Sequence, residues 1–503
     1  MASSTAPSIA APTGIRTVHV RDAAFLLVLS VLPILFLLPL FGAPFERDQG
    51  TYATIARGWM DGAVPYRDLW DNKGPLLFLW YAASFSWLGE TIVAPRVLAG
   101  IAAGLCVPFV WATADRLFDR RVATTAAVVF ALSFANVYLQ VTANAEVFML
   151  LPMTVGLWAF AVGATGGRQG WFLVAGALTA LAVFTRQSAV WMFVGYAAWL
   201  AIVSWREPAD RPRHMASMAA MAAGALLGAA PFVIYFASQG ALLELWHAMF
   251  GFNLGWAAEQ STWLKFVPPL FVEPAPLFGG LLLWVLALIG IWRLWKRSDR
   301  AAWLVLSVLV VSEAAVQTMG KGSAHYSIQL LPAVAISVAV GLPYVARRWR
   351  ARDMAFRSVL AASALVTLCA AAFAYAPPTP EERFVAQYTF RDYADDAVQA
   401  PAIAAAVARM TEAEDCVYEW GRSSQIYFLA DRAPCTRWIH DRPYEVDTTM
   451  LGEVMADLEE RTPAVILVTT DEPPPRELQA FIEEHYRFTE QVAYASLHER
   501  VGG

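Results

Sequence analysis

The sequence predicts a polytopic α-helical membrane protein with a small C-terminal α/β domain, and three observations lead to this fold class. First, 58% of the 503 residues are hydrophobic and only 16% are charged, whereas soluble domains carry about 25% charged residues. Second, the hydrophobic residues gather in eleven blocks, and a membrane-spanning helix needs about 20 apolar residues. Third, residues 1–376 hold 26 Lys/Arg and 18 Asp/Glu, a net +8, while residues 377–503 hold 11 and 24, a net −13. The acidic C-terminal part argues against nucleic acid as a partner.

The eleven apolar blocks predict about 11 transmembrane helices in residues 23–376, preceded by a disordered cytoplasmic tail at residues 1–22. The predicted spans are 23–42, 92–114, 123–143, 147–165, 171–185, 187–204, 215–236, 276–294, 301–319, 326–346 and 357–376. With the N-terminus in the cytoplasm, the cytoplasmic loops contain 18 Lys/Arg and the outer loops contain 8. Because short cytoplasmic loops are enriched in Lys and Arg, this orientation is favoured. It places residues 377–503 outside the cytoplasm.

The first outer loop, residues 43–91, is predicted to hold two helices that lie at the membrane surface. Residues 49–62 place apolar side chains at helical spacing on one side. Residues 75–89 are apolar but short for a span, and their Trp and Tyr side chains favour the headgroup zone. If residues 75–89 crossed the membrane instead, the orientation would be reversed. A second large outer loop, 237–275, is rich in aromatic residues.

Residues 377–503 alternate predicted strands and amphipathic helices, which is typical of an extracytoplasmic α/β domain. The predicted strands are 416–420, 436–439 and 464–470, and the predicted helices are 398–411, 449–460 and 476–485. Outside the cytoplasm, Cys416 and Cys435 are expected to form a disulfide, although two unpaired buried thiols are equally compatible with the sequence. Cys106 and Cys369 lie in apolar blocks and are interpreted as packing residues.

Charged residues close to the membrane are candidates for function, because they are costly to bury unless they pair or act. Asp48 follows the first span closely, and a carboxylate there could accept a proton from a substrate hydroxyl. Asp71 and Lys73 end the polar part of the same loop. Lys73 could face an anionic leaving group, and Asp71 could orient Lys73 or bind a divalent metal together with Asp48. Taken singly, these three residues are better explained as solvated loop charges.

More cations are predicted on the same face of the membrane. Arg186 interrupts a long apolar stretch, Lys321 and His325 precede the tenth span with Tyr326, and Glu146 lies near the fourth span. Arginine binds phosphate with a planar fork, although it also snorkels to interfaces. The cations and a potential base near lipid depth would suit a phosphorylated lipid.

Several segments resemble membrane glycosyltransferases of the GT-C superfamily, in particular the protein-O-mannosyltransferase/aminoarabinose-transferase-like group of glycosyltransferase family 39. These segments are ERDQGTYATIARGWMDGAVPYRDLWDNKGPLLFLWYA after the first span, NAEVFMLLP at 144–152, FTRQSA at 184–189, HYSIQLLPA at 325–333 and YEWGRSSQIYFLADRAPCTRWI in the C-terminal part. The resemblance implies a GT-C type fold and a polyprenyl-phosphate sugar as donor. It implies Asp48 as the general base and Lys73 as a ligand of the donor phosphate.

The chain departs from this resemblance at one position. Many relatives have Asp-Glu where this chain has Asp48-Gln49, so Glu46 is considered as a supporting acid. The implied reaction is an inverting transfer to a lipid, glycan or protein hydroxyl on the outer face of a bacterial cytoplasmic membrane. Lys73, Arg186, Lys321 and His325 would bind the phosphate, with Asp71, Glu46, Tyr326 and Glu146 in support. No cofactor is required, although a divalent metal is compatible. A flippase for a polyprenyl-linked sugar and a non-catalytic scaffold are the alternatives.

Overall fold

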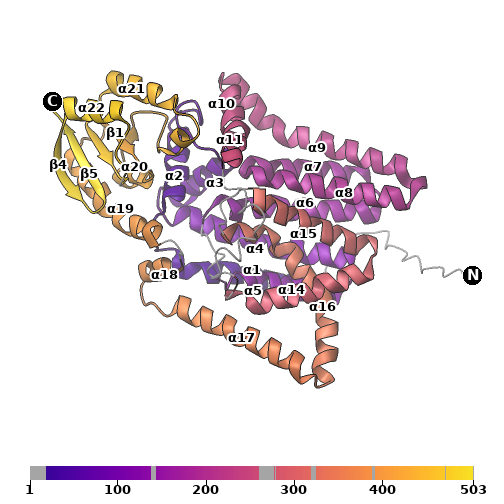
Figure 1. The fold of residues 1–503 in the computed structure, drawn as a ribbon. Helices are drawn as coiled ribbons and strands as arrows, with labels where there is room; N and C mark the ends of the chain where they lie inside the picture. The colour runs from indigo at the N-terminus through magenta and orange to yellow at the C-terminus, as the bar shows by residue number, and fades with distance from the viewer. Residues whose placement is uncertain are drawn as a thin grey trace, which may run out of the picture.

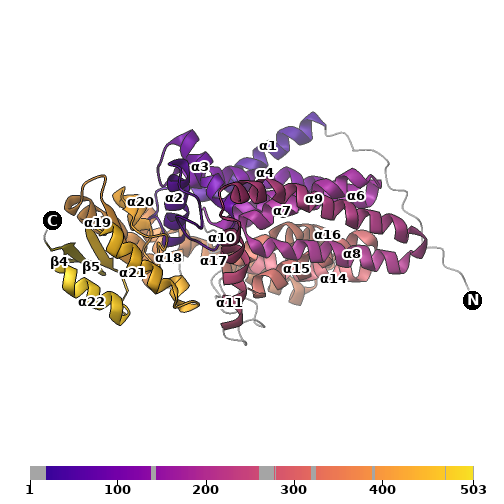
Figure 2. The same cartoon turned by 90° about the horizontal axis from the view of Figure 1, so that it is seen from above.

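The structure is a computed structural model that describes residues 19–136, 143–259, 277, 279–318, 324–387, 391–470 and 472–501. A bundle of long helices occupies most of the molecule, and a small α/β domain lies at one end of it (Figure 1). Helices α2 (Arg47–Met60) and α3 (Pro75–Leu88) lie between the two parts, as both views show (Figures 1 and 2). Residues 1–18 of the predicted tail at 1–22 fall outside the described residues, and the first helix begins at Val20, so residues 20–22 belong to the helix.

A helix overlaps each of the eleven predicted spans, although part of the predicted span 123–143 lies outside the described residues. In chain order these are α1 (Val20–Leu37), α4 (Ala94–Leu117), α5 (Arg120–Ser133), α6 (Ala145–Gly166), α7 (Gln169–Thr185), α8 (Trp191–Arg206), α9 (Arg211–Ser238), α14 (Leu281–Arg297), α15 (Arg300–Thr318), α16 (Leu331–Arg350) and α17 (Met354–Tyr375). Eight helical segments of the described chain are long and apolar enough to cross a membrane. The chain is therefore a multi-pass membrane protein, and α17 stands apart from the bundle (Figure 1).

Helix α2 is covered on both sides, in contrast to the predicted surface helix. Residues 49–56 are all buried, including the polar side chain of Thr51, whose hydroxyl lies 2.6 Å from the hydroxyl of Ser424. Helix α20 (Gln425–Ala430) of the C-terminal domain packs on this side. The approach is so close that a Cβ at Gly50 would overlap the backbone of Gln425. The C-terminal domain, rather than solvent, therefore covers the polar side of α2.

The C-terminal domain contains a five-stranded sheet in the order β2-β1-β3-β5-β4. Its strands are β1 (Cys416–Trp420), β2 (Ala433–Pro434), β3 (Val465–Val468), β4 (Tyr486–Val492) and β5 (Ala495–Arg500). β1 pairs with β2 and β3 in parallel, and β5 is antiparallel to β3 and β4. The main helices around the sheet are α19 (Arg391–Met410), α21 (Met450–Arg461) and α22 (Arg476–His485), which confirm the three predicted helices. Short segments complete the structure: α10 (Leu242–Trp246), α11 (Phe252–Glu259), α18 (Pro380–Gln387), η3 (Gln187–Val190), η7 (Ala324–Leu330) and η8 (Arg442–Glu445).

The prediction of a strand at residues 436–439 is wrong. Pairing with β1 ends at Pro434, and the backbone carbonyl of Arg437 instead accepts a hydrogen bond of 2.8 Å from the backbone N–H of Trp70. Trp438 and Ile439 are buried there without joining the sheet. The residues that looked like a strand thus anchor the domain to the loop between α2 and α3.

The predicted disulfide between Cys416 and Cys435 is present in the structure. Cys416 and Cys435 form a disulfide that joins the start of β1 to the segment after β2. Cys106 is buried in α4, as expected of a packing residue. Cys369 is exposed on α17, so its interpretation as a packing residue is wrong; α17 makes few contacts with the rest of the bundle.

Candidate active site

Two cavities meet beside the first turn of α2 and share part of their lining. The bundle cavity lies among helix ends of the bundle. The domain cavity lies between α2 and the C-terminal domain. Both cavities are lined by Asp48, Tyr52, Asn72, Lys73 and Arg442, which we call the shared wall.

The remaining lining residues give each cavity its character. The bundle cavity is also lined by Glu146, Arg186, Gln187, Asn253, Trp256, Thr318, His325 and Tyr326. The domain cavity is also lined by Arg47, Thr51, Asp71, Arg422, Ser424 and His440. The first set comes from the bundle and its connecting segments, and the second from α2, the loop before α3 and the C-terminal domain.

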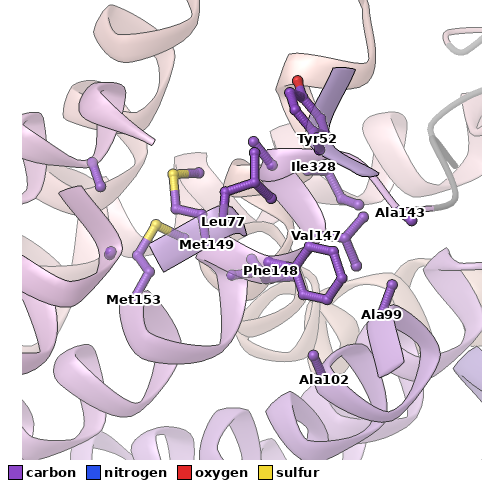
Figure 3. Close-up of a cluster of buried hydrophobic side chains, with 14 of the residues drawn as sticks. Tyr52, Leu77, Ala99, Ala102, Ala143, Val147, Phe148, Met149, Met153 and Ile328 are labelled. Carbon is purple, nitrogen blue, oxygen red and sulfur yellow. The ribbon is translucent and has the colours of Figure 1, made fainter. Parts of the chain in front are cut away.

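Asp48 lies in the first turn of α2, where the unpaired backbone N–H groups of a helix favour a negative charge. Its side chain is half-buried and faces both cavities. One turn further, Tyr52 packs its ring over a hydrophobic cluster that includes Leu77 and Phe148 (Figure 3). This cluster fixes α2 on the bundle, so the carboxylate is held at the junction of the two cavities.

Gln49 and Glu46 do not line either cavity. Gln49 donates a hydrogen bond of 2.5 Å to Glu46 and accepts one of 3.1 Å from Arg96. Arg96 is fully buried and also donates to backbone carbonyls at the end of the first span, including those of Phe41 and Ala43. The residue that replaces the second acid of the resemblance therefore connects α2 to the bundle.

Lys73 lies on the shared wall and is held by its own loop. Its Nζ donates a hydrogen bond of 2.7 Å to Asn72 and lies 5.9 Å from the ring centre of Tyr52. The preceding glycine, Gly74, packs so closely on Phe184 of α7 that a Cβ would overlap its backbone. Burial lowers the pKa of Lys73, and the nearby cations Arg186 and Arg442 act in the same direction against the attraction of Asp71 and Asp48.

Asp71 is buried beside Lys73 and His440. Its carboxylate accepts the backbone N–H of Lys73 at 3.3 Å, and His440 Nε2 lies 3.8 Å from its Oδ1. Burial alone would raise the pKa of Asp71, but Lys73 and then His440 outweigh burial, so the pKa lies below its usual value. Asp71 is therefore an ionised carboxylate that links the first outer loop to the C-terminal domain.

Asn72 is fixed by two other parts of the chain. Its backbone carbonyl accepts hydrogen bonds from Gln187 at 2.5 Å and from Asn253 at 3.2 Å. Its side-chain amide donates to Asn253 at 3.1 Å. The loop that carries Lys73 is thus attached to the segment after α7 and to α11.

Arg186 and Glu146 form an ion pair in which both side chains are buried. Arg186 has an extended backbone between α7 and η3, which directs it into the bundle cavity. Its guanidinium lies 4.1 Å from the ring centre of Tyr326, and His325 Nε2 lies 3.6 Å from Glu146. The structure brings these four predicted residues together, whereas Lys321 falls outside the described residues.

Sequence reasoning missed the contribution of the C-terminal domain. Arg422 and His440 line the domain cavity, and Arg442 reaches the shared wall. The sequence carried little signal for them, because the phrase HDRP follows residues 436–439, which lie outside the sheet.

The described residues contain no group of three or more His, Cys, Asp or Glu side chains that could hold a metal ion. Asp71 is bordered by Lys73 and His440, and Asp48 shares its wall with Lys73 and Arg442. The two carboxylates proposed as metal ligands thus have cationic neighbours from the protein itself.

Comparisons with known proteins connect this geometry to a fold family. Residues 73–235, less than half of the chain, match the profile of the dolichyl-phosphate-mannose-protein mannosyltransferase family. No curated protein matches the sequence. The match begins at Lys73 and includes Glu146 and Arg186, but it ends before His325 and the C-terminal domain.

Solved structures share the architecture over nearly the whole chain. ArnT from Cupriavidus metallidurans bound to undecaprenyl phosphate superposes with a TM-score of 0.62 at 14% identity, covering 96% of this chain and 99% of that chain. The archaeal oligosaccharyltransferase AglB from Archaeoglobus fulgidus, in complex with an inhibitory peptide and a dolichol-phosphate, gives 0.55 at 12% identity, covering 90% and 69%. The chain therefore has the GT-C fold of membrane glycosyltransferases, as the resemblance implied.

Proposed function

From the GT-C fold and the shared wall, we propose that this membrane protein transfers a sugar from a polyprenyl-phosphate donor to a hydroxyl acceptor. The transfer inverts the anomeric carbon and takes place on the outer face of a bacterial cytoplasmic membrane. The profile match and the two structural neighbours, one with undecaprenyl phosphate and one with a dolichol-phosphate, support a lipid-linked donor.

The observation that carries the proposal is that Asp48 and Lys73 line the same wall between two cavities. A carboxylate and an ammonium group at one junction can act on opposite sides of a sugar–phosphate bond. The donor occupies the bundle cavity, where the cations of the helix ends lie. The acceptor enters through the domain cavity and presents its hydroxyl to Asp48.

In the reaction, the acceptor oxygen attacks the anomeric carbon while its proton moves to Asp48. The bond between the anomeric carbon and the phosphate oxygen breaks, and its electron pair stays on the departing polyprenyl phosphate. Positive charge grows on the sugar ring and negative charge on the phosphate. Lys73 stabilises that phosphate, because a preorganised cation acts where charge develops in the transition state. No step requires a metal, and an ion between Asp48 and Asp71 remains a prediction from the sequence.

Arg186 and His325 form the deeper part of the phosphate site. Glu146 offsets the charge of Arg186 in the absence of donor, so a bound phosphate competes with Glu146 for the same guanidinium. Tyr326 stacks on Arg186 and limits its movement. Lys73 lies on the shared wall and is the main ligand of the phosphate. Lys321 stays an additional candidate.

The proposed function is tested with purified full-length protein in lipid nanodiscs and a panel of polyprenyl-phosphate sugars. Mass spectrometry of the products identifies the sugar and whether the acceptor is a lipid, a glycan or a protein. We expect transfer with one sugar of the panel. Movement of a labelled lipid-linked sugar across liposomes without any transfer would instead support the flippase, and no binding of a lipid phosphate would support the scaffold.

A further inference from the structure

Arg442 comes from the C-terminal domain, yet it lines both cavities together with Asp48 and Lys73. It is the first residue of η8, which follows β2. The segment between them is tied at one end by the disulfide of Cys435 and further along by the buried side chains of Trp438 and Ile439. Arg442, more than 350 residues after Asp48 and Lys73 in the sequence, is thereby fixed beside them on the shared wall.

The docking of the C-terminal domain fixes this position relative to α2. Besides the contact of Thr51 with Ser424, Arg57 of α2 pairs with Asp431 at 2.7 Å and donates to the carbonyl of Tyr427 at 3.0 Å. The hydrogen bond from Trp70 to Arg437 holds the segment just before Arg442. Arg442 is therefore held in place by these contacts.

The carboxyl ends of strands β1 and β2 of the C-terminal domain face the site, and α/β folds bind ligands at such strand ends. The chain leaves the central strand β1 toward β2 on one side, and β3 lies on the other side. In such sheets, ligands bind outside the carboxyl ends of the strands where the order reverses. The residues after β1 include Arg422 and Ser424, and those after β2 include His440 and Arg442, which all line the cavities.

Neighbouring arginines of the C-terminal domain differ from Arg442 because they pair with carboxylates. Arg422 pairs with Asp441 and Glu445, and Arg437 pairs with Glu453 at 2.6 Å. Within the part of the chain that the structure describes, Arg442 has no carboxylate partner, and its guanidinium lies 5.5 Å from the ring centre of Trp256 in the bundle cavity. Two cations, Arg442 and Lys73, thus share a wall with one carboxylate, Asp48.

We propose that Arg442 is a catalytic residue that binds the phosphate of the polyprenyl-phosphate donor together with Lys73. The inference rests on the proposed function and deepens it: the C-terminal domain completes the donor site. The planar fork of an arginine can hold two phosphate oxygens at once. Lys73 reaches the phosphate from the loop before α3, and Arg442 reaches it from the C-terminal domain.

The test compares R442Q, R442K and R487Q in the full-length protein. Arg487 is a matched control, because it lies in the same domain and forms an exposed pair with Glu499 at 2.9 Å. Binding of undecaprenyl phosphate without sugar is measured in nanodiscs, and the kcat and KM of transfer are measured for the donor and the acceptor. Thermal unfolding checks that each variant is folded.

We expect R442Q to lower kcat by about 10²-fold or more, as for the loss of one transition-state donor, and to weaken undecaprenyl phosphate binding. R442K should recover part of both, and R487Q should match the wild type. If R442Q does not fold, R442K decides by the same two measurements. Unchanged lipid phosphate binding and kcat, or a change in the acceptor KM alone, would overturn the inference. Absence of transfer by the wild type itself would refute the proposed function, while the binding measurement would still decide on Arg442.

Discussion

His440 Nε2 lies 3.8 Å from Asp71 Oδ1, and this contact joins the C-terminal domain to the loop that carries Lys73. Burial raises the pKa of Asp71, but Lys73 and then His440 lower it by more, so that it lies below its usual value. The contact places an imidazole within the lining of the domain cavity, next to the proposed catalytic residues. Removal of His440 should therefore change the ionisation of Asp71.

The variant H440Q tests this contact. Lys73 and His440 both lower the pKa of Asp71, so removal of His440 should raise that pKa. Asp71 is protonated as the pH falls through its pKa. Because that pKa is higher in H440Q, the acidic limb of the pH profile of kcat should move to higher pH. H485Q, a change in α22 away from both cavities, is the control. An acidic limb in the same position in H440Q and wild type would show that the ionisation of Asp71 does not affect transfer.

Lys73 should set the alkaline limb of the activity profile. Its pKa is lowered mainly by burial, so the ammonium group should lose its proton, and transfer should decline, below the usual pKa of 10.5. K73R keeps a positive charge at all accessible pH values and should retain reduced activity with a flatter alkaline limb. K73Q should lose about 10²–10³-fold in kcat. An alkaline limb that is identical in K73R and wild type would assign the titration to another group.

Glu419 gives the C-terminal domain a stability that depends on pH. Burial raises the pKa of Glu419 from 4.5 to about 8, despite hydrogen bonds from Thr469 and the backbone of Ser423. The folded domain therefore binds a proton more tightly than the unfolded chain. This contribution is fully present below about pH 4.5 and is lost as the pH rises through about 8.

Pulse proteolysis of the full-length protein in urea checks this expectation at pH 6 and pH 9. The wild type should become more susceptible at pH 9, whereas E419Q, which keeps the shape and cannot ionise, should change little. The control E484Q removes an exposed carboxylate of α22 and should behave like the wild type. Equal pH dependence in E419Q and wild type would contradict the assignment to Glu419.

The sequence was informative where local patterns decide the structure. Blocks of about 20 apolar residues specify membrane helices through their length; all eleven overlap helices, and eight helical segments of the described chain are long and apolar enough to span. Arg186, Glu146 and His325 were placed on one face by counting spans, and in the structure they contact one another. Isolated charges near the membrane therefore carried most of the information about the bundle cavity.

The sequence was uninformative where docking decides the structure. Residues 436–439 have the composition of a strand, but a hydrogen bond to Trp70 and the burial of Trp438 keep them out of the sheet. The polar side of α2 looks solvent-exposed until α20 covers it. His440 and Arg442 reach the site only because the domain docks on α2, and no periodicity in the sequence reports that contact.

The most direct test of the central claim is the variant D48N, assayed for transfer and for binding of undecaprenyl phosphate. Asparagine keeps the shape of Asp48 but cannot accept the acceptor's proton, and a general base contributes about 10²–10⁴-fold to a rate. D61N, which changes an exposed carboxylate at the other end of α2, is the matched control. We predict that D48N binds the lipid phosphate as the wild type does and loses at least about 10²-fold in transfer. Transfer by D48N at the wild-type rate would contradict the account.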